Sequence, residues 1–279
     1  MAIKIITDST CDLPQEIVEQ YNIEVLPLKV IFGKKEYVDG IDLTVEQFYS
    51  MLVEAKDLPT TSQVTPEQFN KVYEKAKADG DDVISIHISS DMSGTLQSAN
   101  ISKDHVEYDK IHLVDSRTVT VQLGMMVVEA CRMKESGASV DEILARLDEM
   151  VEKTVLYASI ATLEYLKKGG RIKASSAAIG SALNIKPIIT IADGLVESIG
   201  KARGTKKSFE EIKKLIENSG TTLDGKEIYI GHASDTENMA KLKEFLLKHY
   251  KPSKVVECVV GACVGTHAGP GCVTVAFEQ

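Results

Sequence analysis

Short apolar runs alternate with helix-like segments through the first half of the chain. The runs are IKII at residues 3–6, VISIHI at 83–88 and IHLVDS at 111–116, and a helix-like segment follows each of them. Such runs are typical of buried strands, and parallel strands must be joined by long crossovers that usually contain a helix. The alternation therefore predicts a mainly parallel sheet with helices on both faces.

Two helix starts carry strong local signals. Thr65 precedes Pro66, and Gln68 stands three residues after the threonine. Ser139 and Glu142 have the same spacing. Both pairs match the capping box, in which the two side chains bond each other's backbone N–H groups. We expect a helix to begin directly after Thr65 and another directly after Ser139.

The pattern changes near residue 155. Residues 186–200 read as two strands joined by a tight turn at Asp193 and Gly194, the residue pair most typical of a hairpin turn. Further strand-like runs are EIYIGHA at 227–233, VVECVV at 255–260 and VTVAF at 273–277. These runs predict an antiparallel or mixed sheet. We therefore expect an α/β protein of two domains: residues 1–155 with a parallel α/β/α sheet, and residues 156–279 with a mixed or antiparallel α/β arrangement.

Composition narrows the class of partner. The 279 residues carry a formal net charge of −9. Duplex DNA and anionic membranes both attract a basic face, so neither is expected as the main partner. No apolar stretch approaches the roughly 20 residues that a membrane span requires. The chain also begins directly with a strand-like run and without a signal-peptide pattern, so we expect a cytoplasmic protein.

The cysteines do not form a recognisable framework. Five of them are scattered along the chain, and the one cluster is Cys258, Cys263, His267 and Cys272. This cluster lacks the closely spaced cysteine pairs of structural zinc sites. We expect buried free thiols and no bound metal.

Four polar segments stand out as candidate ligand-binding loops. They are TDSTCDLP at 7–14, TTSQVTP at 60–66, SSDMSGTLQSA at 89–99 and DSRTVT at 115–120. Ligands of open α/β sheets bind where the carboxyl ends of the strands meet. In the third segment Ser93 and Gly94 stand at the start of an expected helix, whose first backbone N–H groups attract an anion.

Nucleotide-binding and hydrolase signatures are absent. The chain has neither a Walker-type phosphate loop nor the dinucleotide fingerprint, and Asp91 stands where a nucleophile elbow needs glycine. A nucleophilic Ser93 would require a histidine base, for which His267 is the one candidate in a conspicuous loop. An enzyme that processes a small carboxylate or phosphate through Ser93, Cys11 or His267 nevertheless remains an alternative.

Basic and glycine-rich segments supply further candidates. The segment VGTHAGPGCV at 264–273 reads as a glycine-rich loop, in which His267 can donate a hydrogen bond to an anion and can add a positive charge when protonated. KKGGRIK at 167–173 and KARGTKK at 201–207 are either solvated faces or anion contacts through Arg171 or Arg203.

Taken together, these segments resemble the DegV family of bacterial fatty-acid-binding proteins over essentially the whole chain. Met92, Leu96 and Ala268 depart from the residues usual in the family, and these differences concern only details of the binding cavity. The matching segments occur in the family's order and spacing: ITDSTCDLP, PTTSQVTP, SSDMSGTLQSA, LVDSRTVTVQLG, LEYLKKGGRI, NIKPIITIADG, KARGTKK and GTHAGPG.

The resemblance implies a two-domain α/β protein that encloses one long-chain fatty acid between its domains. By this analogy Thr61 and Ser93, with Gly94 beside it, hydrogen-bond the carboxylate from the first domain. His267 and Arg171 approach the head group from the second domain.

The resemblance also implies a partner. In members of the FakB type, a separate ATP-dependent fatty acid kinase subunit phosphorylates the bound acid, and the acyl phosphate enters phospholipid synthesis. Arg203 would then lie near the mouth of the cavity and face this partner. The chain itself would be a cytoplasmic carrier without a cofactor, a monomer that binds no nucleic acid and makes at most peripheral membrane contact. A lipid-responsive interaction protein without a kinase partner is a further alternative.

Overall fold

The structure is a computed structural model that describes residues 2–176 and 184–279. Its first sheet has four parallel strands in the order β2-β1-β6-β7. Their bounds are Glu24–Leu26 for β2, Ile3–Asp8 for β1, Asp82–His87 for β6 and Ile111–Asp115 for β7. The predicted parallel sheet is thus confirmed, and the three apolar runs of the first half are its three longer strands.

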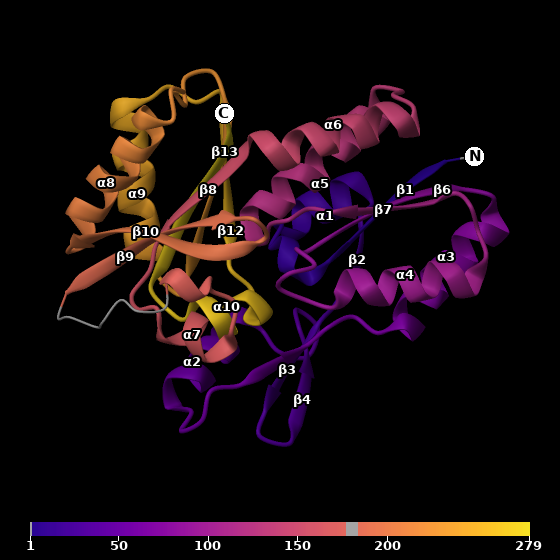
Figure 1. Ribbon diagram of the computed structural model, residues 1–279, viewed down its shortest axis with the longest axis horizontal. Helices are drawn as coiled ribbons and strands as arrows, with labels where there is room; N and C mark the ends of the chain where they lie inside the picture. Colours follow the sequence, from indigo (N-terminus) through magenta and orange to yellow (C-terminus); the bar gives the residue numbers. More distant parts are fainter. Residues whose placement is uncertain (1, 177–183) are drawn as a thin grey trace.

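Helices cover both faces of this sheet (Figure 1). One layer is α3 and α4, which pack on each other and on β6 and β7, and the other layer contains α1, α5 and α6. Their bounds are Gln15–Tyr21 for α1, Pro66–Asp79 for α3, Thr95–Val106 for α4, Thr120–Glu135 for α5 and Val140–Lys153 for α6. The expected caps are present, since Gln68 accepts a hydrogen bond from the Thr65 backbone and Ser139 accepts one from the Glu142 backbone.

The second sheet has six strands in the order β10-β9-β8-β13-β11-β12. It is mixed, because only β11 and β12 pair in parallel. The strands are Thr154–Ser159 for β8, Ile185–Ala192 for β9, Leu195–Arg203 for β10, Glu227–Ala233 for β11, Lys254–Val259 for β12 and Cys272–Glu278 for β13. The hairpin turn is at Asp193 and Gly194, both with positive φ (50° and 77°), as its sequence predicts.

Helix α5 lies between the two sheets. It packs on β1 of the first sheet and on β8, β11 and β13 of the second, while α8 (Thr205–Asn218) and α9 (Thr236–His249) pack on the six-stranded sheet and on each other. Every α5 residue from Thr120 to Cys131 except Glu129 is buried. The two sheets take their strands from either side of residue 155 but share this core, so the division into domains 1–155 and 156–279 remains a prediction.

A small antiparallel sheet, which the sequence does not reveal, completes the fold. It has the order β4-β3-β5 and contains Lys35–Val38, Lys29–Phe32 and Thr60–Ser62. Helix α2 (Val45–Glu54) follows β4, and both α2 and β5 contact the short helix α10 (Ala262–Ala268). The expected glycine-rich loop at 264–273 is therefore partly helical, and His267 lies in the last turn of α10.

All five cysteines are buried and free. Over residues 2–176 and 184–279, no cluster of side chains has the composition of a metal site. Within the same ranges, no helix is both long enough and apolar enough to cross a membrane.

Candidate ligand-binding site

A cavity of about 330 Å³ lies between the elements of both sheets. Its volume falls within the range of small-molecule sites. Most of its wall is aliphatic or weakly polar, and comes from β8, β9, β10, α10 and the loops after β1 and β6. The apolar residues of the wall are Leu28, Ile88, Met92, Val119, Leu156, Ala158, Leu166, Ile189, Ile191, Val196, Val260, Cys263, Val264, Ala268 and Cys272.

The structure brings five of the six predicted site residues to this one cavity. Thr61, Ser93, Gly94, Arg171 and His267 all line it, although they come from separate segments of the chain. Arg203 is not among the lining residues. It is exposed at the end of β10, and its predicted place near the mouth of the cavity stays a prediction.

Thr61 and His267 contact each other across the cavity. The Thr61 Oγ1 atom is 3.0 Å from His267 Nε2. Burial and the positive charge of Arg171 lower the pKa of His267 to about 4, so the imidazole is neutral at pH 7. The positive charge considered for His267 is therefore absent at this pH.

The surroundings of His267 also indicate which ring nitrogen carries the proton. Its Nδ1 atom is buried and has no hydrogen-bond partner among the described residues. A Cβ built on Gly169 would stand 2.2 Å from this atom, so only glycine fits at that position. An unpaired N–H would be costly there, and we therefore assign the proton to Nε2, which donates to Thr61 Oγ1. Thr61 then keeps its own hydroxyl proton for a ligand.

Ser93 and Gly94 directly precede helix α4 at its N-terminus, as the sequence predicts. Ser93 Oγ accepts a hydrogen bond from the Thr95 backbone at 3.2 Å and lies 3.0 Å from Thr95 Oγ1. Gly94 is the N-cap residue, and a Cβ there would stand 2.1 Å from Oε1 of Gln63. The missing side chain at position 94 thus lets Gln63 lie over the start of the helix, where its amide donates to Ser98 Oγ at 2.8 Å.

Arg171 is held by backbone carbonyl groups from both sides of the cavity. Its Nε donates to Met92 O at 3.1 Å, and its Nη1 donates to Gly169 O. A guanidinium group has five N–H donors, so these two bonds leave donors for an anion. Its charge also lies close enough to His267 to oppose protonation of the imidazole.

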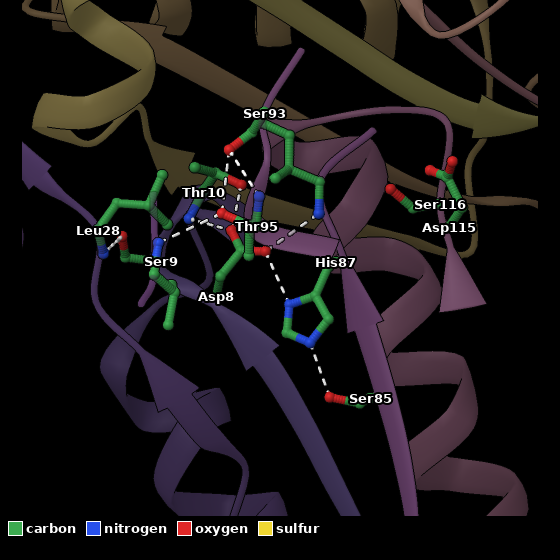
Figure 2. Close-up of polar contacts among 12 residues, drawn as sticks. Asp8, Ser9, Thr10, Leu28, Ser85, His87, Ser93, Thr95, Asp115 and Ser116 are labelled. Atoms are coloured by element: carbon green, nitrogen blue, oxygen red, sulfur yellow. Dashed lines mark hydrogen bonds and ion pairs between the residues drawn. The ribbon is translucent and has the colours of Figure 1, made fainter. Parts of the chain in front are cut away.

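A buried hydrogen-bond chain lies behind Thr10 of the cavity wall (Figure 2). Asp8 accepts from the backbone and hydroxyl of Thr10 at 3.1 and 2.5 Å, and from His87 Nδ1 at 3.0 Å. His87 Nε2 lies 2.7 Å from Ser85 Oγ, which lies 2.8 Å from the hydroxyl of Tyr73. Asp8, His87 and Ser85 are all fully buried, so this Asp–His–Ser order is structural.

The geometry disfavours the enzymatic alternative. In the described part of the chain the hydrogen bonds of the Ser93 hydroxyl group join it to Thr95, whereas His267 faces Thr61. A nucleophilic serine needs a base within hydrogen-bond reach. Cys11 is buried, and burial raises the pKa of its thiol well above the ordinary value, so it remains protonated.

Several lining residues were not singled out from the sequence. Thr10, Gln63 and Thr120 belong to polar segments that were expected to bind a ligand, but Thr274 lies on a strand with no such signal. Thr10, Thr120 and Thr274 donate their hydroxyl protons to Asp8, Asp12 and the Tyr157 carbonyl respectively. This part of the wall therefore has few free donors.

Comparison with known proteins shows close relatives over the full length. The model of the DegV family, described as a family of uncharacterised proteins, matches residues 2–279. A DegV domain-containing protein of Caldanaerobacter subterraneus is 36% identical over 277 residues, which cover 99% of each chain. Another from Clostridium acetobutylicum is 37% identical over 277 residues, covering 99% of this chain and 98% of the relative.

Solved structures agree in fold. A DegV family protein from Thermus thermophilus, described as binding fatty acid, superposes with a TM-score of 0.93 at 34% identity and full coverage of both chains. DegV from Bacillus subtilis, described as a fatty-acid-binding protein, gives 0.85 at 31% identity, again with full coverage of both. A DegV lipid-binding protein from Thermotoga maritima gives 0.89 at 31% identity, with 100% of this chain and 98% of the other covered. By sequence and by fold, this chain belongs to the DegV family.

Proposed function

We propose that this protein binds one long-chain fatty acid in the cavity between residues 1–155 and 156–279. The observation that carries the proposal is the composition of the cavity wall: an aliphatic surface onto which Thr61, Ser93, Arg171 and His267 converge. Solved relatives above 30% identity that are described as fatty-acid-binding support the same ligand.

The hydrogen-bond donors suit a carboxylate. The hydroxyls of Thr61 and Ser93 and the guanidinium of Arg171 can donate to a ligand, and Gly94 begins α4 at its positive end. Nε2–H of His267 donates to Thr61 and so leaves the Thr61 hydroxyl proton for the ligand. An ionised carboxylate only accepts hydrogen bonds, so it matches such a group of donors. By contrast, the threonines elsewhere in the wall donate to the protein itself.

The hydrocarbon tail would supply most of the affinity. Each buried methylene contributes about 0.8 kcal/mol, so a chain of about 16 carbons gives more than ~10 kcal/mol of gross burial energy. The polar residues then determine which end of the ligand lies at Thr61 and His267. The aliphatic residues from β8, β9 and β10 are the natural wall for the tail.

The second part of the proposal is presentation of the carboxylate to a separate ATP-dependent fatty acid kinase subunit, with the acyl phosphate product feeding phospholipid synthesis. The exposed residues Lys201, Arg203, Lys206 and Lys207 support it, because they form a basic segment on an acidic protein. Arg203 is exposed and outside the cavity wall, which suits a contact with the partner or with phosphate. The carrier would act as a cytoplasmic monomer without a cofactor or metal.

Mass spectrometry of an organic extract of the denatured, purified protein tests the ligand. We expect a near-stoichiometric fatty acid of about 14 to 18 carbons, consistent with the burial energy above. An empty extract, repeated after incubation with oleate and palmitate, would contradict the carrier function. Measurable turnover of a small carboxylate or phosphate ester that is lost in Ser93→Ala would favour the enzymatic alternative.

The kinase step needs its own experiment. With a fatty acid kinase subunit and ATP, Arg203→Ala is expected to lower acyl phosphate yield without changing fatty acid affinity. Lys248→Ala is a matched control, because Lys248 is an exposed cation on α9, which packs on the six-stranded sheet. An unchanged yield with Arg203→Ala would argue against Arg203 as the partner contact.

A further inference from the structure

Two carboxylates of the first half of the chain meet the start of helix α10. Asp12 Oδ1 accepts a hydrogen bond from the Gly261 backbone at 2.9 Å, and Asp39 Oδ1 accepts one from the Ala262 backbone at 3.2 Å. The paired residues are 249 and 223 positions apart in the sequence. Both aspartates are buried, at 8% and 6% exposure.

The same carboxylates are fixed from behind by hydroxyl groups. Asp12 Oδ2 accepts from Thr120 Oγ1 at 2.6 Å, at the first residue of α5. Asp39 Oδ2 accepts from Ser9 Oγ at 2.8 Å. Each carboxylate thus accepts from a hydroxyl group of the first half of the chain with one oxygen and from the α10 backbone with the other.

Close packing leaves α10 little freedom at this end. A Cβ on Gly261 would stand 2.9 Å from Asp12 Oδ1 and 3.7 Å from Asp39 Oδ1. Tyr49 donates its hydroxyl to the Val260 carbonyl at 3.0 Å, and a Cβ on Gly265 would stand 2.5 Å from the same hydroxyl oxygen. The beginning and one side of α10 are therefore held by the first half of the chain.

We infer that Asp12 and Asp39 are positioning residues that hold α10 so that His267 faces Thr61 and the ligand carboxylate. Neither aspartate lines the cavity, and His267 lies in the last turn of the helix whose first N–H groups they bind. A displaced α10 would move His267 Nε2 away from its 3.0 Å contact with Thr61. This inference rests on the proposed fatty-acid binding, which it extends to residues outside the cavity.

The energetic cost of these groups supports a role beyond stability. Burial raises the pKa of both aspartates, and the hydrogen bonds that they accept oppose this effect only in part. Charge-assisted hydrogen bonds are short and directional, so they fix geometry even where the buried charge contributes little net stability.

The test uses Asp12→Asn and Asp39→Asn, each of which retains the shape of the side chain but replaces one acceptor oxygen with an amide. Fatty acid affinity is measured by displacement of a fluorescent fatty acid by oleate. We expect each substitution to weaken binding by roughly tenfold, the typical effect of one lost hydrogen bond to a charged group. Glu227→Gln is the matched control, because Glu227 also joins the two halves, through Arg132, but lies outside α10 and the cavity wall.

A double-mutant cycle shows whether the effect passes through His267. In a His267→Gln background, Asp39→Asn is expected to cause little further loss of affinity, because the two residues would act as one unit. Equal losses with and without His267, or the same loss in Glu227→Gln, would show general loosening instead and overturn the inference. An unchanged affinity in both single variants would overturn it as well.

Nitrogen NMR of His267 in the ligand-free variants separates this inference from the proposed function. We expect Asp12→Asn and Asp39→Asn to shift the Nε2 resonance of His267, and Glu227→Gln to leave it unchanged. If the wild-type protein binds no fatty acid, the proposed function fails, while the NMR result still decides whether the aspartates position His267. Identical His267 spectra in the wild type and both variants would overturn the positioning role.

Discussion

Thr61 Oγ1 lies 3.0 Å from His267 Nε2, although the two residues are 206 positions apart. The contact joins the short strand β5 to helix α10 at the wall of the cavity. Because the neutral imidazole donates a hydrogen bond to Thr61, the threonine hydroxyl can donate its own hydrogen bond to a ligand oxygen. A carboxylate placed there would receive donors from both halves of the chain at once.

Replacement of Thr61 by valine tests this pair. Thr61→Val retains the shape but removes both the acceptor for His267 Nε2–H and the donor for the ligand. We expect fatty acid affinity to fall by about 1–2 kcal/mol, which is roughly a tenfold increase in Kd. Isothermal titration with oleate measures it. Thr60→Val is the control on the same strand, because Thr60 is exposed and outside the cavity wall; equal effects of the two substitutions would contradict the assignment.

Gly94 offers a steric prediction. A Cβ at this position would stand 2.1 Å from Gln63 Oε1, so Gly94→Ala must displace the Gln63 side chain and its hydrogen bond to Ser98. We expect a loss of about 1 kcal/mol of stability by urea unfolding, because the exposed Gln63 side chain can turn away and the main loss is its hydrogen bond to Ser98. In a Gln63→Ala background, which lacks this side chain, Gly94→Ala should cause little further loss.

Gly200→Ala is the control for that experiment. Its new Cβ would be 3.7 Å from Ile188, an ordinary contact, and it should change stability little. If Gly94→Ala costs no more than Gly200→Ala, or costs as much in the Gln63→Ala background as in the wild type, the contact with Gln63 does not explain the glycine.

The strands and caps of this fold could be predicted where local patterns are strong. VISIHI and the Asp193–Gly194 turn have periodicity or turn chemistry that one segment displays by itself. By contrast, β3, β4 and β5 contain only three or four residues each, too few to show a period. Helix α10 was hidden because glycines surround His267, and its seven residues are stabilised by contacts from distant segments.

The candidate site also has residues that could be predicted from the sequence and residues that could not. Local chemistry indicated an anion near Ser93 and Gly94 and offered His267 and Arg171 as anion contacts, while the family resemblance added Thr61 and identified the anion as a fatty acid carboxylate. The cavity wall could not be predicted, because Leu156, Ile189 and Val196 have the same composition and spacing as core residues. Gln63 was missed because its role depends on a missing side chain at Gly94, which is a contact in space.

His267 makes stability depend on pH. Its pKa is about 4 in the folded protein and about 6.5 in the unfolded chain, so between these values the unfolded chain binds more protons. Stability from this group is fully present above pH 6.5 and falls by about 3 kcal/mol as the pH drops to 4. Urea unfolding at several pH values should therefore show a shallower acid loss in His267→Gln than in the wild type.

The comparison with His267→Gln is needed because Asp12 and Asp39 change the free energy of unfolding with pH in the opposite direction to His267. Their raised pKa means that the folded protein binds protons more readily than the unfolded chain, so acid relieves part of their burial cost. These two groups are common to wild type and His267→Gln and cancel in the difference. Parallel curves for the two proteins between pH 6.5 and 4 would contradict the lowered pKa of His267.

The buried hydrogen-bond chain that runs from Tyr73 through Ser85 and His87 to Asp8 predicts losses of stability of different size at its two ends. Asp8 accepts from Thr10, His87 and the Ile88 backbone, so Asp8→Ala leaves several buried donors without a partner. We expect a loss of about 3–5 kcal/mol, because several buried donors lose their acceptor at once. Tyr73→Phe removes only the last link, to Ser85, and should cost about 1 kcal/mol.

Urea unfolding measures both substitutions, and Asp79→Ala is the control because its carboxylate is exposed and pairs with Lys75 across one helical turn. If the chain is structural, folded Tyr73→Phe should bind oleate with wild-type affinity, since Tyr73 lies outside the cavity wall. A large loss of oleate binding in a fully folded Tyr73→Phe protein would instead place this buried hydrogen-bond chain in the binding machinery, because it reaches the cavity wall through Asp8 and Thr10.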